Sequence, residues 1–154
     1  MIIQGIAHWA KVVGDPQPAY DKSKREWTID VEINSETKKK LVKEGLGHKI
    51  KMSKGEDQYE YIQFKRPEFR FDGTKAKPIR IVHADGKTPW GDEKIGNGSV
   101  VNVSFLVNET SYQGKKHLKP GIVAIQVVKF VPYEGKNEFV PVDEDGNEVW
   151  DAED

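Results

Sequence analysis

The chain has 154 residues with 24 Lys and Arg against 25 Asp and Glu, a net charge of -1, four His and no Cys. Its length predicts one domain and excludes a large multidomain enzyme, and the missing cysteines exclude disulfides, thiolate zinc sites and Cys nucleophiles. Because the chain has no apolar run of about 18 residues and its first residues lack the pattern of a secretory signal, we expect no membrane partner and an intracellular location.

The first third of the chain is predicted to hold two strands and the only helix. Residues 2–13 form a strand that ends in a turn. Apolar and polar side chains alternate along residues 27–33, which is the period of a sheet with one buried face. The helix is expected over residues 36–44, with Asn34 or Ser35 as its N-cap and a glycine as its stop.

Four further strands are predicted after the helix. They cover residues 59–65, 79–83, 99–107 and 121–131, and the last two are expected to pair across the loop between them. Five or six strands with one short helix suit a small barrel or sandwich. We predict an all-β domain with one short helix. An OB-fold, a five-stranded Greek-key barrel, fits the strand count, although the count alone does not separate it from other small β folds.

Charge is unevenly distributed between this domain and the end of the chain. Residues 134–154 hold nine acids and one lysine, a net charge of -8, whereas residues 1–133 hold 23 bases and 16 acids, a net charge of +7. This distribution is typical of proteins with nucleic-acid partners, because the basic body attracts phosphates and the tail opposes them. A solvated tail that aids solubility is the alternative. We predict a folded domain over 1–133 and an acidic C-terminal tail over 134–154.

Residue patterns for catalysis are weak. The four His lie more than 30 residues apart in the chain, so none forms a local pair of metal ligands. The glycine-rich segment 96–99 lacks the ending of a P-loop and is predicted to be a tight turn. Four aspartates could meet at Mg²⁺ in a nuclease, but each lies beside Gly or Pro, which favours a role in turns: Asp15, Asp72, Asp85 and Asp92. We expect no catalytic residue, metal or cofactor.

Patterns for binding single-stranded nucleic acid are richer. Such binding needs cations for the backbone and exposed rings on which bases stack, and residues 49–80 interleave the two. The predicted contacts in this stretch are Lys49, Lys51, Tyr59, Tyr61, Lys65 and Arg70. The alternative is that Phe64, Phe69 and Phe71 fill the core while the cations only solvate a strand face. We adopt the core reading for Phe64 and leave the exposure of the two tyrosines open.

A second cluster of rings and cations is predicted in the segment 110–120. We expect this segment to form a loop between two strands. Eleven residues are long for a hairpin connection, and long ordered loops are usually functional. The predicted contacts are Tyr112, Lys115, Lys116 and Lys119, with Trp90 as one more ring for stacking. A merely solvated loop is the alternative, and the lysines of the predicted helix are read as its exposed face.

Three segments carry a resemblance to a known family. Residues 77–87, 95–103 and 123–133 resemble the bacteriophage single-stranded-DNA-binding proteins typified by those of T7-like phages, and the Gly-Asn-Gly-Ser turn before a β-run is the most specific motif. The resemblance implies an OB-fold, an acidic C-terminal tail and no enzymatic activity. It also implies sequence-tolerant binding of single-stranded DNA in phage replication, recombination and repair, in the cytoplasm of the infected bacterial host.

The resemblance also implies roles for particular residues. Tyr112 is similar in position to the ring-bearing loop on the DNA face of the family. The tail is implied to contact replication proteins (polymerase, helicase or primase) through Asp143, Glu144, Asp145, Glu148, Trp150, Asp151, Glu153 and Asp154. Family tails tend to finish on an aromatic residue, whereas Trp150 lies four residues before the end. A homodimer, a metal-dependent nuclease and a protein-interaction module without DNA affinity stay open.

Overall fold

The computed structural model describes residues 1–133 except for residues 21, 56 and 71. The predicted tail contacts therefore lie outside the described residues: Asp143, Glu144, Asp145, Glu148, Trp150, Asp151, Glu153 and Asp154. The same holds for Phe71, and the division of the chain at residue 133 stays a prediction. Within the described ranges, no helix is long and apolar enough to cross a membrane.

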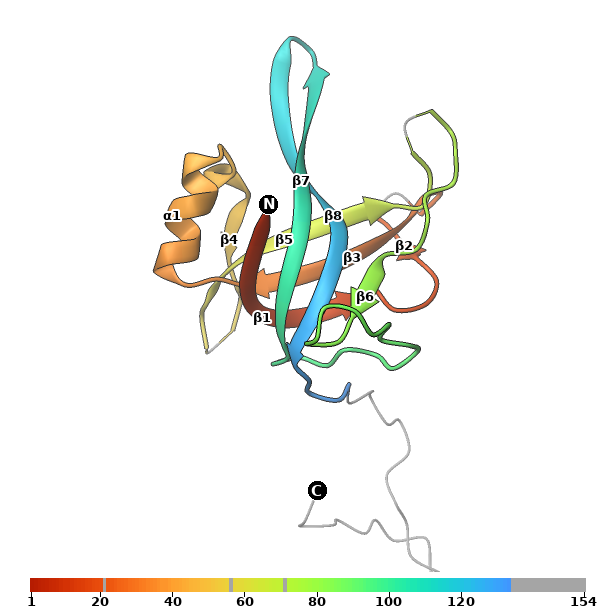
Figure 1. The fold of residues 1–154 in the computed structure, drawn as a ribbon. Coiled ribbons are helices and arrows are strands. Elements are labelled where there is room, and N and C mark those ends of the chain that lie inside the picture. The colour runs from red at the N-terminus through yellow and green to blue at the C-terminus, as the bar shows by residue number, and fades with distance from the viewer. Residues whose placement is uncertain (21, 56, 71, 134–154) are drawn as a thin grey trace, which may run out of the picture.

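Five long strands close into a barrel (Figure 1). They are β1 (Ile2–Lys11), β3 (Arg25–Glu32), β5 (Glu60–Pro67), β7 (Val100–Tyr112) and β8 (Lys115–Lys129). β1 pairs antiparallel with β3 and β7, β3 pairs with β5, and β7 pairs with β8. A parallel contact between Lys65 of β5 and Gly121 of β8 completes the ring. This closed order of five strands is the predicted OB-fold.

Shorter elements extend the barrel at its rim. They are β2 (Gln17–Pro18), α1 (Ser35–Lys43), the 3-10 turn η1 (Gly47–Lys49), β4 (Ile50–Met52) and β6 (Arg80–Val82). β4 pairs antiparallel with β5, and β6 pairs parallel with β8. β2, β4 and η1 were not predicted, because segments of two or three residues are too short to show an apolar period.

The helix begins where the sequence predicts. The side chain of Asn34 accepts a hydrogen bond from the backbone N–H of Thr37 at 2.8 Å, which identifies Asn34 as the N-cap. Leu41 is the buried residue of α1, and its lysines are exposed as predicted. Gly45 follows the helix with φ +82°, a conformation that favours glycine at a helix end.

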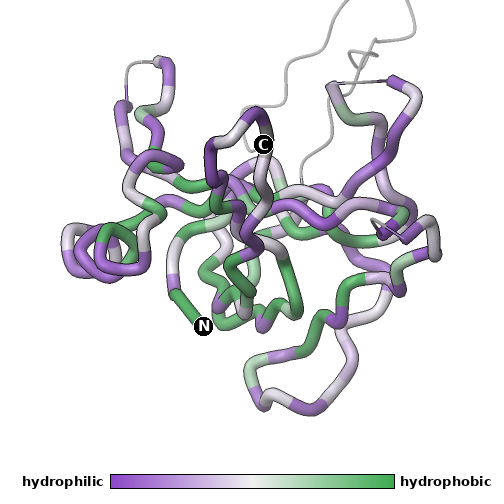
Figure 2. Tube along the Cα trace, turned by 90° about the horizontal axis from the view of Figure 1, so that it is seen from above, coloured by the Kyte–Doolittle hydropathy of each residue, from purple (hydrophilic) through white to green (hydrophobic). Residues whose placement is uncertain are grey.

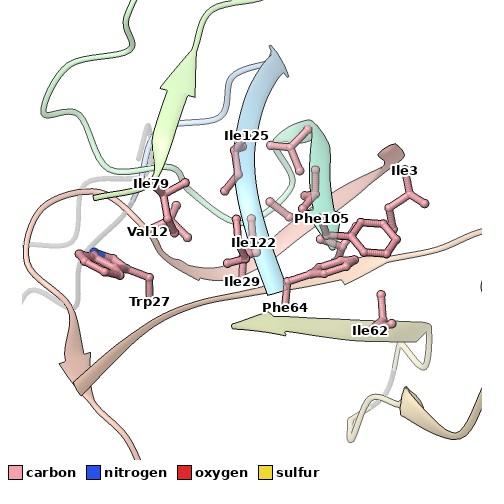
Figure 3. Packing of buried hydrophobic residues seen from close by; sticks show 14 of the residues in the cluster. Ile3, Val12, Trp27, Ile29, Ile62, Phe64, Ile79, Phe105, Ile122 and Ile125 are labelled. Carbon is pink, nitrogen blue, oxygen red and sulfur yellow. The ribbon is translucent and has the colours of Figure 1, made fainter. Parts of the chain in front are cut away.

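The core forms from the inward side chains of the strands (Figure 3). Trp27, Ile29 and Val31 are buried along β3, which confirms the predicted alternation. The ring of Phe64 from β5 meets that of Phe105 from β7 with centroids 4.8 Å apart, so Phe64 is a core residue as predicted. Hydrophobic positions concentrate on the central strands, and hydrophilic ones dominate the projecting segments (Figure 2).

The predicted loop over 110–120 is wrong, because both strands continue into it. β7 ends at Tyr112, β8 begins at Lys115, and the connection is the dipeptide Gln113-Gly114. Both of these residues have positive φ, +52° and +76°, as a type I′ hairpin turn requires. The ribbon projects beyond the barrel (Figure 1). Most of its side chains on either face are exposed, so its polar sequence lacks the alternation that reveals a half-buried strand.

Candidate nucleic-acid interface

One outer surface of the barrel combines rings and charges. On β3 and β5 the inward residues fill the core, so their neighbours along each strand point outward. The strand register then sets these outward residues side by side in three rows across β1, β3, β5 and β4. The rows are Ile6, Glu32, Tyr61 and Lys51; His8, Asp30 and Gln63; and Lys11, Thr28 and Lys65. We call this surface, with the adjoining Tyr59, the outer face.

Three rings meet on the outer face. Tyr59 lies parallel to His8, with centroids 4.3 Å apart and an interplanar angle of 14°. Tyr61 approaches Tyr59 edge-on at 6.0 Å. Both tyrosines are half-buried, so each keeps ring surface open to solvent. The structure therefore brings together two predicted rings and adds His8, which the sequence did not reveal because the pairing of β1 with β3 joins residues 22 positions apart.

The backbone of Tyr59 is fixed from both sides. Its N–H donates to Oγ of Ser53 at 2.9 Å, and its carbonyl oxygen accepts from the N–H of Ser53 at 2.9 Å. These bonds close the turn between β4 and β5 just before the ring-bearing segment. Anchoring the backbone lowers the number of orientations that the ring explores, which favours stacking.

Three of the predicted lysines lie near enough to a fourth, Lys49, to repel its charge: Lys51, Lys65 and Lys119. Burial lowers the pKa of Lys49, and repulsion from the other three lysines lowers that pKa further. We call these four residues the lysine cluster. They come from η1, β4, β5 and β8. Lys65 has a distant carboxylate neighbour, Glu26, at 3.9 Å. Because like charges held together repel, an anion bound here would relieve the repulsion.

Carboxylates lie among the rings of the outer face. Burial raises the pKa of Asp30, against a hydrogen bond from Gln63 at 3.0 Å and the charges of His8, Lys51 and Lys11. Glu32 lies 3.5 Å from Nε2 of His8. Burial also raises the pKa of the Tyr59 hydroxyl, and the charges of Asp30 and Glu32 add to this. The outer face is thus acidic along β3 and basic toward the lysine cluster.

Trp90 has a packing role in this structure. Its ring contacts those of Phe130 at 4.9 Å and His83 at 4.6 Å. Its indole N–H donates to the carbonyl oxygen of Glu93 at 2.7 Å. Neither partner ring belongs to the outer face, so we leave Trp90 out of the interface.

The other predicted cations are exposed at two projecting turns. Lys115 and Lys116 lie at the tip of the β7–β8 hairpin, where Lys116 is 3.5 Å from a carboxylate oxygen of Glu109. Arg70 lies in the turn after β5, and its charge adds to the effect of burial in lowering the pKa of Arg66. The backbone of Tyr112 pairs with Lys115, but its side chain lies outside what the structure describes.

Four Phe, Tyr or Trp rings exposed in the described part of the chain were not among the predicted contacts: Trp9, Tyr20, Phe69 and Tyr133. Phe69 is 55% exposed, so the alternative that it fills the core is wrong. Trp9 is 64% exposed, although it lies within β1. Exposed apolar rings are informative because a strand usually buries them. For Phe69 the neighbouring Arg70 was a usable signal, whereas nothing local marked Trp9.

The two best-defined aspartates serve turns, as predicted. Asp72 accepts from the N–H of Thr74 at 2.9 Å. Asp85 accepts from the N–H groups of Lys87 and Thr88 at 2.8 and 2.9 Å. Together with a bond from the Thr88 hydroxyl, these lower the pKa of Asp85 to about 2. Among residues 1–133 that the structure describes, no group of three or more His, Asp and Glu is placed to hold a metal ion.

Solved structures of bacteriophage proteins are similar to this chain. The crystal structure of gp2.5, a single-stranded DNA binding protein encoded by bacteriophage T7, matches with a TM-score of 0.54 and 17% identity, over 90% of this chain and 91% of that one. The single-stranded DNA-binding protein of bacteriophage Enc34 in complex with ssDNA matches with a TM-score of 0.61 and 11% identity, over 87% and 88% of the two chains. This chain has the fold of these phage proteins.

The structural likeness confirms two predictions. One is the OB-fold. The other is the resemblance to phage single-stranded-DNA-binding proteins, which was visible in only three segments of the sequence and extends in the structure over most of the chain. The Enc34 protein without DNA matches to a similar degree, with a TM-score of 0.59 and 11% identity over 90% of this chain and 85% of that one. No protein-family model and no curated protein matches the sequence.

Proposed function

We propose that this protein binds single-stranded DNA with little sequence preference, through the outer face and the lysine cluster. The observation that carries the proposal is the strand register that sets Lys51 beside Tyr61, on a surface whose tyrosines are partly exposed. Stacking on an aromatic ring contributes about 1 to 3 kcal/mol per base and tolerates any base. The role is that of a binding protein without a catalytic step or cofactor.

Charge on the outer face suggests how a strand would lie. Phosphates are repelled by Asp30 and Glu32 on β3 and attracted by the lysine cluster. The backbone of the strand would therefore follow the lysines, with bases directed toward Tyr59 and Tyr61. Flanking contacts would come from the exposed cations and the remaining predicted ring: Arg70, Tyr112, Lys115 and Lys116.

The cellular role follows as the finer part of the proposal. We propose action in phage DNA replication, recombination and repair, in the cytoplasm of the infected bacterial host. Residues 134–154, with a net charge of -8, would form a separate acidic tail that competes with DNA for the basic body and contacts replication proteins such as a polymerase, helicase or primase. The opposite charge of residues 1–133 supports this competition.

The proposal is tested by equilibrium binding of a labelled oligo-dT to the full chain across a range of salt concentrations. We expect the logarithm of affinity to fall with the logarithm of salt by about 0.7 for each phosphate neutralised. Added Mg²⁺ should leave the oligonucleotide intact. Absence of binding at low salt would reject the proposed function, and cleavage that requires Mg²⁺ would point to a nuclease instead.

A further inference from the structure

Trp9 has an unusual backbone conformation for its size. Its φ is +50°, in the left-handed region that bulky residues avoid because Cβ crowds the backbone. Its indole is nevertheless 64% exposed, so burial of the ring does not offset this cost. Strained residues persist where the surrounding structure enforces them, and they concentrate at functional sites.

A β-bulge directs the indole outward. His8 pairs with Asp30 and Lys11 pairs with Thr28, so two residues of β1, Trp9 and Ala10, stand opposite one residue of β3. Regular alternation after the outward His8 would send the next side chain into the core. Ala10 packs against the core instead, and the indole is left in solvent.

The Gly-Asn-Gly-Ser turn holds this strained residue. The backbone N–H of Trp9 donates to Oδ1 of Asn97 at 2.7 Å. Gly98, with φ +96°, donates from its N–H to the carbonyl oxygen of Ala7 at 2.9 Å. On the other side the buried hydroxyl of Ser99 donates to Gly96 at 2.9 Å. A side chain at Gly96 would collide with the carbonyl oxygen of Pro132, so the turn packs closely against the chain after β8. Asn97 is therefore held in place to accept the hydrogen bond from Trp9.

Trp9 also adjoins the proposed interface. It follows His8, whose ring stacks on Tyr59, and it lies two residues before Lys11, an outward cation of the outer face. A flat exposed ring beside a cation and other rings is the combination that binds a nucleobase. We propose that Trp9 is a base-stacking platform for single-stranded DNA that extends the ring series of the outer face at β1. This inference rests on the proposed function.

The test compares oligo-dT affinity and thermal unfolding of the full chain with those of Trp9→Ala, Trp9→Phe and Trp9→Gly. Loss of one stacked base predicts affinity about 5-fold to 150-fold weaker for Trp9→Ala, with the salt slope unchanged because no charge is removed. Trp9→Phe should retain most of the affinity. Trp9→Gly should weaken binding like Trp9→Ala while unfolding at an equal or higher temperature, because glycine accepts the positive φ.

Tryptophan fluorescence gives an independent reading. All variants carry Trp150→Phe, because displacement of the tail by DNA would also change the fluorescence of Trp150. Trp27 is 2% exposed and Trp90 packs against His83 and Phe130, so stacking of a base should quench mainly Trp9. The quenching should largely disappear in Trp9→Phe. Trp90→Phe is the matched control and should keep both the affinity and the quenching. Unchanged affinity in Trp9→Ala, or quenching that persists in Trp9→Phe, would overturn the proposal. A drop in oligomeric state with unchanged affinity would show a protein contact instead. Failure of the unmodified chain to bind would reject the proposed function itself.

Discussion

The outer face and the tip of the β7–β8 hairpin both contain tyrosines and lysines, but the surroundings of these residues differ. Both were predicted from tyrosines beside lysines. On the outer face, the ring of Tyr59 stacks on His8, and Lys49 is repelled by three lysines from other elements. At the tip, Lys115 and Lys116 are exposed, and the contact of Lys116 with Glu109 joins two exposed side chains. The difference teaches that a preorganised site needs neighbours from other strands, which composition does not supply.

Charge reversal should separate the two regions most strongly. We expect the double variant Lys51→Glu and Lys65→Glu to weaken oligo-dT binding on the order of a hundredfold, since two positive charges of the lysine cluster become negative. The salt slope should also fall by about 0.7 per lost phosphate contact. The matched variant Lys115→Glu and Lys116→Glu should cost less. Titration by fluorescence anisotropy measures both, and a larger loss for the tip pair would reverse the comparison.

Removal of single rings should show the same ranking with smaller effects. Tyr59→Ala removes a ring fixed between His8 and Tyr61, and we expect affinity about tenfold weaker. Tyr112→Ala should also weaken binding, by less, because the hairpin tip projects beyond the barrel that carries the outer face (Figure 1). Both affinities are measured at one salt concentration. Equal affinity of Tyr112→Ala and the unmodified chain would remove Tyr112 from the interface.

Deletion of residues 143–154 tests which region the tail opposes. The deletion removes seven acids and no base, which changes the net charge from -1 to +6. We expect several-fold tighter DNA binding at low salt, with the gain lost as salt screens the charges. The gain should persist in the Lys115→Glu and Lys116→Glu background and shrink in the Lys51→Glu and Lys65→Glu background. Equal or weaker binding after deletion would contradict competition by the tail.

The smallest expected effect concerns Asp30, the carboxylate beside His8 on the outer face. Asp30→Asn keeps an acceptor for Gln63 and removes a negative charge from the outer face, so oligo-dT affinity should rise about threefold. Because burial raises the pKa of Asp30, the carboxyl becomes neutral at a higher pH than usual. Binding by the unmodified chain should therefore strengthen on mild acidification, with a smaller change in Asp30→Asn. Glu109→Gln at the hairpin is the matched control. An equal rise in affinity for that variant would contradict a specific effect of Asp30.

Local patterns predicted much of the fold and part of the site. Alternation along 27–33, the Asn34 cap and the turns at Asp72 and Asp85 all depend on neighbours within a few residues. Four residues of the outer face were also identified from composition: Lys51, Tyr59, Tyr61 and Lys65. The extension of the hairpin was not, because a ribbon exposed on both faces has no period to detect.

The sequence by itself determined the central part of each long strand, the helix with its cap, the tight turns and the types of residue available for binding. Only the tertiary structure decided which of them meet. Closure of β5 on β8, the stack of His8 on Tyr59 and the bulge that exposes Trp9 all depend on register between distant segments. A shift of one residue in a strand moves every side chain to the opposite face, so no local pattern specifies such contacts.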